Sequence, residues 1–242
     1  MHPARIAELL HPFLSPTQHS EPGQRPGDES DVLSEIQSQN ISTYIDILLR
    51  WNSRINLTAI RDEEHIVTRH FGESLFAARL LFPPVPFANQ QPLASPIRLA
   101  DLGSGAGFPG IPIKLWNPNV SLTLIESNHK KATFLREVVR TLTLTDVDIQ
   151  NVRAESLPAS SFDIVTLRAV ERFADALPVA ARLLTPEGRL ALLIASSQVS
   201  VATSTFPSLH WIPPTPIPAS RERVVLLGRR NKISEQVGSN TH

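Results

Sequence analysis

The segment Leu99-Ala-Asp-Leu-Gly-Ser-Gly-Ala-Gly-Phe-Pro-Gly110 decides the fold. It follows a short apolar run typical of a β-strand and opens a helix, which is where a parallel sheet binds a nucleotide-like cofactor. Gly103 and Gly105 permit a tight turn and a close approach of the backbone to a ligand. Pro109 suits the first turn of a helix, where a missing N–H group costs nothing. The segment therefore predicts a cofactor-binding β–α turn.

Strands and helices alternate on the C-terminal side of this turn. Strands are expected at residues 97–103, 120–127, 147–152, 162–170 and 189–195, with helices at 109–116, 129–142 and 173–184. Such alternation with short links is typical of a right-handed, mostly parallel, doubly wound sheet. Two more β-type runs, at 208–213 and 222–228, predict a terminal antiparallel pair. The expected fold is therefore α/β and Rossmann-like, with a seven-stranded sheet.

A helical region punctuated by proline-rich stretches precedes the sheet. Apolar residues at helical spacing predict helices at 4–14, 32–51 and 68–81. We expect five segments: a short helix with a flexible connector (1–31), a helical N-terminal extension (32–82), a proline-rich linker (83–96), the α/β domain (97–228) and a loose tail (229–242).

Two cofactors compete for the glycine turn. A dinucleotide site prefers G-x-G-x-x-G, but the sixth position here is Phe108, which is too large for close helix–strand packing. Asp101 lies two residues before the first glycine, where it suits the positively charged amino acid part of S-adenosylmethionine. Glu126, at the end of the second strand, suits ribose hydroxyls in either cofactor. The combination of Asp101 and Phe108 favours S-adenosylmethionine.

Further cofactor contacts are expected where the next strands end. Ala154 and Glu155 follow the third strand, where a methyltransferase usually fixes adenine. Arg168 ends the fourth strand, and because a core-facing arginine is costly unless paired, we expect it in the cleft, with Asp163 or Glu171 as the alternative partner. The expected cofactor contacts at this point are Asp101, Gly103, Gly105, Glu126, Ser127, Asn128, Ala154 and Glu155. The sequence thus predicts a class I S-adenosylmethionine-dependent methyltransferase with a helical N-terminal extension.

The chemistry that the sequence lacks narrows the methyl acceptor. The chain has no cysteine, and methylation of pyrimidines at C5 requires a cysteine nucleophile. The segment after the fourth strand has no [DNS]-P-P-[FYW] motif for amino-group methylation, and the four lysines supply no ribose-methylating tetrad. What remains is an acceptor that is already nucleophilic, such as guanine N7, whose in-plane lone pair carries no proton. For such an acceptor, positioning and electrostatics suffice for transfer. The histidine spacing predicts no metal site.

The zero net charge does not argue against a nucleic-acid partner. Residues 1–96 hold 7 basic and 11 acidic side chains, whereas residues 97–242 hold 16 and 12. The neutral total is thus the sum of an acidic helical part and a basic α/β part. No apolar run reaches the roughly 20 residues of a membrane span, and no signal-peptide pattern is present, so we expect a soluble cytoplasmic protein.

Five motifs are specific enough to compare with a known family. They are Trp51-Asn-Ser-Arg-Ile-Asn-Leu-Thr58, Ile60-Arg-Asp62, Arg69-His70, Asp101-Leu-Gly-Ser-Gly-Ala-Gly-Phe-Pro-Gly-Ile-Pro112 and Thr166-Leu-Arg-Ala-Val170. Together they resemble the bacterial RsmG (GidB) family of 16S rRNA guanine-N7 methyltransferases. The resemblance covers residues 32–228. It departs at two positions: Ile194 stands where the family usually has a lysine, and Glu73 where it usually has an aspartate.

The resemblance implies a function and places residues around it. Cofactor contacts fall on Gly103, Phe108, Glu126, Ala154, Glu155 and Arg168. The substrate side is expected to use Arg168 with Arg69 and His70, beside an RNA-facing mouth. The implied partner is 16S rRNA, in the small ribosomal subunit or its assembly intermediate, and we expect a monomer.

Other interpretations remain open from the residues alone. The chain is alternatively a methyltransferase acting on a small molecule or protein, or a non-catalytic assembly factor that binds cofactor or RNA. Trp51 is also typical of a core residue at a helix end, with Asn52 or Asn56 as a cap. His70 is equally typical of a partly buried histidine whose hydrogen bonds are satisfied.

Overall fold

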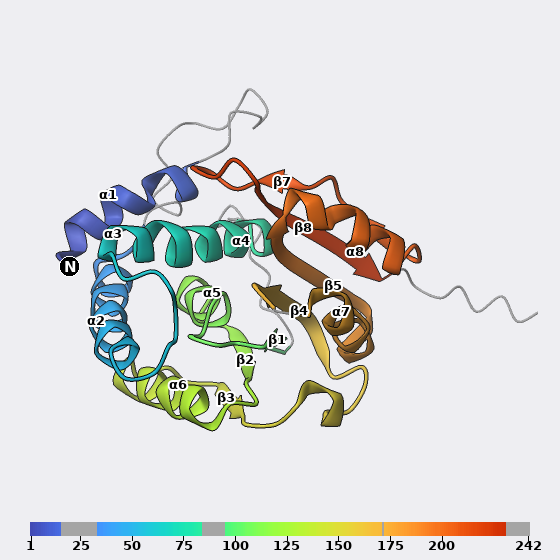
Figure 1. The fold of residues 1–242 in the computed structure, drawn as a ribbon, viewed down its shortest axis with the longest axis horizontal. Helices are drawn as coiled ribbons and strands as arrows, with labels where there is room; N and C mark the ends of the chain where they lie inside the picture. Colours follow the sequence, from blue (N-terminus) through green and yellow to red (C-terminus); the bar gives the residue numbers. More distant parts are fainter. Residues whose placement is uncertain (16–32, 84–94, 171, 231–242) are drawn as a thin grey trace, which may run out of the picture.

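A mixed β-sheet forms the middle layer of the computed structural model, which describes residues 1–15, 33–83, 95–170 and 172–230 (Figure 1). The strand order is β3-β2-β1-β4-β5-β8-β6, and β7 pairs with β8 beside this path. The strands are β1 (Ile97–Leu102), β2 (Val120–Ile125), β3 (Val147–Gln150), β4 (Phe162–Arg168), β5 (Leu184–Ala195), β6 (Leu209–Trp211), β7 (Thr215–Pro216) and β8 (Arg223–Arg230).

The pairing agrees with the predicted doubly wound topology. All pairs among β1 to β5 are parallel, while β8 runs antiparallel to β5, β6 and β7. The predicted terminal antiparallel pair is therefore confirmed. The sheet has eight strands and not seven, because Thr215–Pro216 adds a two-residue strand along β8.

Helices cover both faces of the sheet. The helical elements are α1 (Pro3–Leu14), α2 (Glu35–Asn52), α3 (Glu63–Ile66), the π-helix η2 (Val67–Gly72), α4 (Glu73–Leu81), α5 (Gly110–Trp116), α6 (His129–Thr141), η4 (Ala154–Ser156), α7 (Phe173–Leu183), η5 (Ser196–Gln198) and α8 (Val199–Thr205). One core cluster joins the first face of the sheet to α1, α2, α4, α5 and α6, and the other joins the second face to α7 and α8. Along each central strand, alternate residues enter one cluster or the other.

The helical extension shares its core with the sheet. Ile6 and Leu10 of α1 and Ile41 of α2 are fully buried in the cluster that contains Leu99 and Ile164 of the sheet. A capping box between Ser34 and Gln37 starts α2. None of the helices in the described ranges is long and apolar enough to cross a membrane.

Two element boundaries differ from the predicted ones, and one helix was not predicted. The helix predicted from residue 68 begins at Glu63, because Asp62 caps it by accepting a hydrogen bond from the His65 N–H at 2.9 Å. Strand β5 begins at Leu184, which pairs with Phe162 ahead of a register shift. Helix α8 was not predicted, since its β-branched residues are weak helix formers.

The predicted loose tail from Arg229 is wrong for its first two residues. Arg229 pairs with Arg189 of β5 and Arg230 with Leu209 of β6, so both belong to β8. The Arg230 guanidinium also donates to the Leu184 carbonyl at 2.8 Å. The rest of that tail, residues 16–31 of the predicted connector and most of the 83–96 linker lie outside the described residues.

Candidate cofactor and substrate site

The glycine turn lies at the carboxyl end of β1, next to the point where the strand order reverses. Gly103 and Gly105 have φ values of +71° and +57°, which favour glycine. Among the described residues, a Cβ added to Gly103 would approach only Val170, at 3.8 Å, and one on Gly105 only the Gly103 carbonyl, also at 3.8 Å. The turn therefore presents open space above these two glycines, which suits a ligand held against the backbone.

The far side of the turn is packed against the helical extension. A Cβ on Gly107 would collide with the Tyr44 hydroxyl, which donates to the Ala106 carbonyl. The Phe108 ring is 5% exposed and stacks between Tyr44, with centroids 5.4 Å apart, and His70, at 4.8 Å. Phe108, expected to contact the cofactor, is thus buried against two aromatic rings of the extension.

Asp101 supports the turn from beneath. Its side chain is 1% exposed, Oδ1 accepts from the Thr166 hydroxyl at 2.8 Å, and Oδ2 accepts from the Gly110 N–H at 3.1 Å. Burial raises the pKa of Asp101 to about 6, outweighing the hydrogen bonds that lower it. Both carboxylate oxygens accept hydrogen bonds from within the protein, so Asp101 stabilises the turn. Thr166, its partner on β4, was not predicted as a site residue.

Glu126 joins the end of β2 to the turn. Its Oε2 accepts from the Gly105 N–H at 2.9 Å and its Oε1 from the Asn128 N–H at 2.7 Å. Asn128 caps α6 by accepting from the N–H groups of the two following lysines. Asn151, missed in the sequence, donates to the carbonyls of Glu126 at 2.8 Å and Ser127 at 3.1 Å. The structure therefore brings Glu126 and the following two residues beside Gly105, and their contacts with the cofactor stay a prediction.

Ala154 and Glu155 lie at the end of β3 in the short helix η4. The Arg182 guanidinium donates to both of their carbonyls, each at 3.1 Å. Ala154 is 9% exposed, whereas the Glu155 side chain is exposed. This pair occupies the expected place, one strand beyond Glu126.

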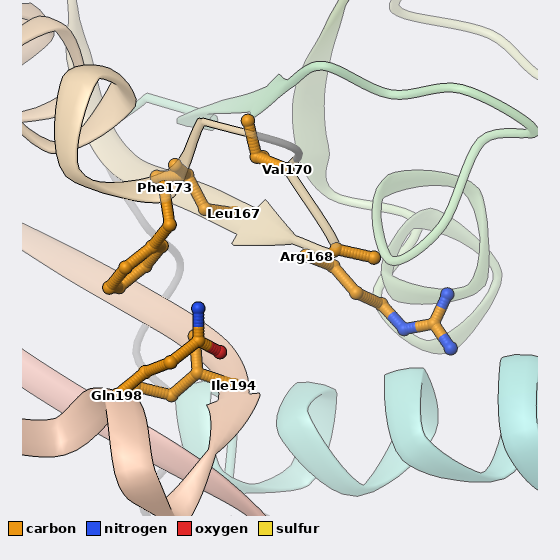
Figure 2. A pocket seen from close by; sticks show the side chains of 7 residues that line it. Leu167, Arg168, Val170, Phe173, Ile194 and Gln198 are labelled. Atoms are coloured by element: carbon orange, nitrogen blue, oxygen red, sulfur yellow. The ribbon is translucent and has the colours of Figure 1, made fainter.

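Arg168 points away from the cleft and into the helical extension, contrary to the expected orientation. Strand alternation sends Leu167 towards the α7 face and Arg168 towards the face that η2 and α4 cover (Figure 2). Its guanidinium donates to the Arg69 carbonyl at 2.8 Å and pairs with Glu73 at 3.2 Å. Of the two predicted alternative partners, Asp163 pairs with Arg98 instead, and Glu171 lies outside the described residues.

Glu73 is the centre of an ion cluster that the sequence did not reveal. Its carboxylate is 1% exposed and lies 3.0 Å from Arg69, 3.2 Å from Arg168 and 3.1 Å from Arg223. The three arginines come from η2, β4 and β8. This position is where the family usually has an aspartate, and the longer glutamate joins the extension to two strands of the sheet. We call Glu73, Arg69, Arg168 and Arg223 the Glu73 cluster.

His70 is held between the cluster and a loop. Its Nδ1 accepts from Arg168 at 3.0 Å, which assigns the proton to Nε2 for donation to the Thr58 hydroxyl at 2.8 Å. Burial, and then the positive charge of Arg168, lower the pKa of His70 to about 3. The imidazole is therefore neutral at physiological pH. Arg69, Arg168 and His70, predicted to act together, do lie together.

Trp51 and Asn52 have structural contacts. The Trp51 indole N–H donates to Glu137 of α6 at 2.9 Å. The Asn52 side chain accepts from the N–H groups of Leu57 and Thr58 and donates to the Thr58 carbonyl at 2.9 Å. Asn52 thereby holds Thr58 in place beside His70, which agrees with its interpretation as a local cap.

A pocket opens at the carboxyl ends of β4 and β5, and Figure 2 shows its side chains. Its lining comes from Leu167, Ala169, Val170, Phe173, Ile194 and Gln198, with the backbone side of Arg168. Ile194 is the residue that replaces the family's usual lysine, so here that wall is apolar. Val170 borders both this pocket and Gly103. A ligand on the glycine turn would therefore adjoin a second ligand in the pocket.

The comparisons with solved structures show the class of fold, which is that of the S-adenosylmethionine-dependent methyltransferases. The ribosomal protein L11 methylase of Lactobacillus delbrueckii subsp. bulgaricus is similar with a TM-score of 0.53 and 15% identity, over 67% of this chain and 79% of that chain. TYW2 of P. horikoshii in complex with MeSAdo is similar with a TM-score of 0.52 and 14% identity, over 67% of this chain and 63% of that chain.

The sequence comparisons show the family. A family model described as rRNA small subunit methyltransferase G (GidB) matches residues 37–203. The ribosomal RNA small subunit methyltransferase G of Xylella fastidiosa (strain 9a5c) is 39% identical over 181 residues, covering 74% of this chain and 78% of the relative. The ribosomal RNA small subunit methyltransferase G of Chloroflexus aggregans is 40% identical over 169 residues, covering 65% of this chain and 66% of the relative. The chain belongs to the rRNA small subunit methyltransferase G family, which confirms the resemblance found in its sequence.

Proposed function

We propose that this protein transfers the methyl group of S-adenosylmethionine to N7 of a guanine in 16S rRNA. The observation that carries the proposal is the glycine turn, which is open above Gly103 and Gly105 and flanked by the Glu126 carboxylate, in a chain of this family. The substrate is the small ribosomal subunit or its assembly intermediate, the enzyme acts as a monomer, and its compartment is the cytoplasm, where ribosomes are assembled.

The residues at the turn fit the cofactor. Gly103 and Gly105 leave room for its amino acid part, Glu126 offers carboxylate oxygens to ribose hydroxyls, and Ala154 and Glu155 flank the place for adenine. Asp101 acts by holding the turn, and Phe108 by fixing it to the extension. When bound, the cofactor supplies an electrophilic methyl group.

The protein's contribution to transfer at N7 is positioning. Guanine N7 already has a free lone pair, so no side chain has to remove a proton. His70 fits this chemistry, because both of its nitrogens have partners and its pKa of about 3 keeps it neutral. We assign Arg168 and His70 to holding the substrate side in place, and Arg69, whose side chain is 44% exposed, to the RNA-facing mouth.

Labelled S-adenosylmethionine with small subunits from cells that lack the enzyme tests the proposal. Label on the 16S rRNA, with chain cleavage at the labelled base after mild reduction and aniline, is the expected result. Label on RNA without such cleavage would contradict N7 as the acceptor. Label on a protein or small molecule would favour the alternative methyltransferase, and cofactor binding without transfer would favour a non-catalytic assembly factor.

A further inference from the structure

Gln198 places in the pocket at the ends of β4 and β5 a hydrogen-bond donor for which the described part of the chain offers no acceptor. Its side-chain Oε1 accepts from the Ala195 backbone N–H at 3.0 Å. Only the oxygen of the amide group can accept that bond, so the amide orientation is fixed. The Nε2 amino group then points into the space between Phe173 and Leu167 (Figure 2). No residue that the structure describes accepts a hydrogen bond from Nε2.

The remaining walls of this pocket suit a flat aromatic ligand. Phe173, the half-buried first residue of α7, faces Gln198 across the opening (Figure 2). Leu167 and Ile194 supply an apolar base and are buried, at 1% and 3% exposure. An aromatic ring, apolar walls and one oriented polar group are the features with which proteins hold an unstacked nucleobase and read its edge.

The pocket also adjoins the glycine turn. Val170 lines the pocket, and its Cγ2 lies 3.8 Å from the place of a Cβ on Gly103. A base in the pocket and a cofactor on the turn would therefore meet beside Val170. The guanidinium of Arg168 points away from this place and pairs with Glu73, so it does not lie between the base and the cofactor.

We propose that this pocket receives the methyl-acceptor base and that Gln198 selects guanine by donating from Nε2 to the O6 atom. This inference rests on the proposed function and names the residue that reads its substrate. Guanine presents O6 and N7 as neighbouring acceptors on one edge, whereas adenine has an amino group in the place of O6. Two donors would then oppose each other, so adenine is rejected. The bond to O6 fixes the edge while leaving the N7 lone pair free for the methyl group.

Gln198→Glu tests the donor while preserving the local fold. A glutamate still accepts from the Ala195 N–H but cannot donate to O6. We expect kcat/KM for labelling small subunits to fall about 10- to 100-fold, which corresponds to about 1.4–2.7 kcal/mol at 25 °C. The melting temperature and the affinity for S-adenosylmethionine should match wild type. Ser197→Ala, at an exposed neighbour outside the pocket, is the matched control and should keep full activity.

A change in the substrate tests the same bond with the wild-type protein. Once cleavage has located the target, 16S rRNA carrying 2-aminopurine there lacks O6 but keeps N7. Wild type should methylate it about 10- to 100-fold more slowly than guanine. The Gln198→Ala variant should methylate guanine slowly, and its rate should fall no further on 2-aminopurine. The reason is that the substitution and the base change remove the same hydrogen bond.

The outcomes separate this inference from the proposed function. If wild type labels guanine N7 but Gln198→Glu does so equally fast, or 2-aminopurine reacts like guanine, Gln198 does not read the base and this inference alone fails. If wild type places no label at a guanine N7 of the small subunit, both fail. Should Gln198→Glu not fold, the comparison of 2-aminopurine with guanine on wild type decides.

Discussion

Replacing Glu73 by glutamine should destabilise the protein more than any exposed ion pair would. The substitution keeps the shape of the side chain but removes its negative charge. Arg168 and Arg223, whose side chains are only 10% and 20% exposed, would then face each other as like charges without a counterion. Breaking a buried ion pair by removing one partner costs about 3–5 kcal/mol. For a chain of this size that corresponds to a melting temperature lower by about 6–20 °C.

Urea unfolding followed by tryptophan fluorescence and circular dichroism measures this free energy of unfolding. Asp163→Asn is the control, because the Arg98–Asp163 pair is 52% and 38% exposed and should contribute less than about 1 kcal/mol. A Glu73→Asp variant restores the charge and should recover part of the loss. If Glu73→Gln costs no more than Asp163→Asn, the Glu73 cluster does not hold the extension to the sheet.

Further perturbations separate the parts of the site. Gly103→Val should weaken S-adenosylmethionine binding at least about 100-fold by calorimetry, since the side chain enters the open space of the turn. An unchanged affinity would show that the cofactor does not bind at this turn. Gly107→Ala should instead lower stability by about 1–3 kcal/mol, because its methyl group meets the Tyr44 hydroxyl. Tyr44→Phe should cost about 1–3 kcal/mol in unfolding experiments by leaving a buried carbonyl unpaired. The folded pKa of His70, about 3, lies below its unfolded value of about 6.5, so acid favours the unfolded state, and stability should fall by about 2 kcal/mol between pH 6.5 and 5. His70→Asn should reduce this loss of stability in melts measured at several pH values. If wild type and variant lose stability equally with falling pH, the pKa of His70 is not lowered in the folded protein.

The layered architecture could be predicted because apolar alternation and glycine placement are local signals. Strands β1, β2 and β4 follow from their own residues, and the turn from Gly103 and Gly105. The π-helix η2 could not be predicted, since its backbone hydrogen bonding leaves no distinct apolar period. Helix α8 was missed because its β-branched residues are typical of strands, while packing of Ala202 against the α7 side stabilises it.

The site residues likewise divide into those that local sequence predicts and those that depend on distant partners. Glu126 and Asn128 were predicted from their place after a strand, which topology alone determines. The direction of Arg168 was available from alternation along β4, because Leu167 is the residue that shares a face with α7. The role of Glu73 was not available, since its partners come from elements far apart in the chain. A buried carboxylate is recognised only when its counterions are known.

The hydrogen bond from Tyr44 to the Ala106 carbonyl makes the extension part of the cofactor turn. Binding free energies at linked sites are reciprocal, so a surface that shifts α2 on docking must alter cofactor affinity by the same factor by which the cofactor alters docking. A ribosomal particle whose docking tightens cofactor binding would therefore hold the cofactor-loaded enzyme more tightly, and loss of the cofactor from the turn would favour departure from the particle.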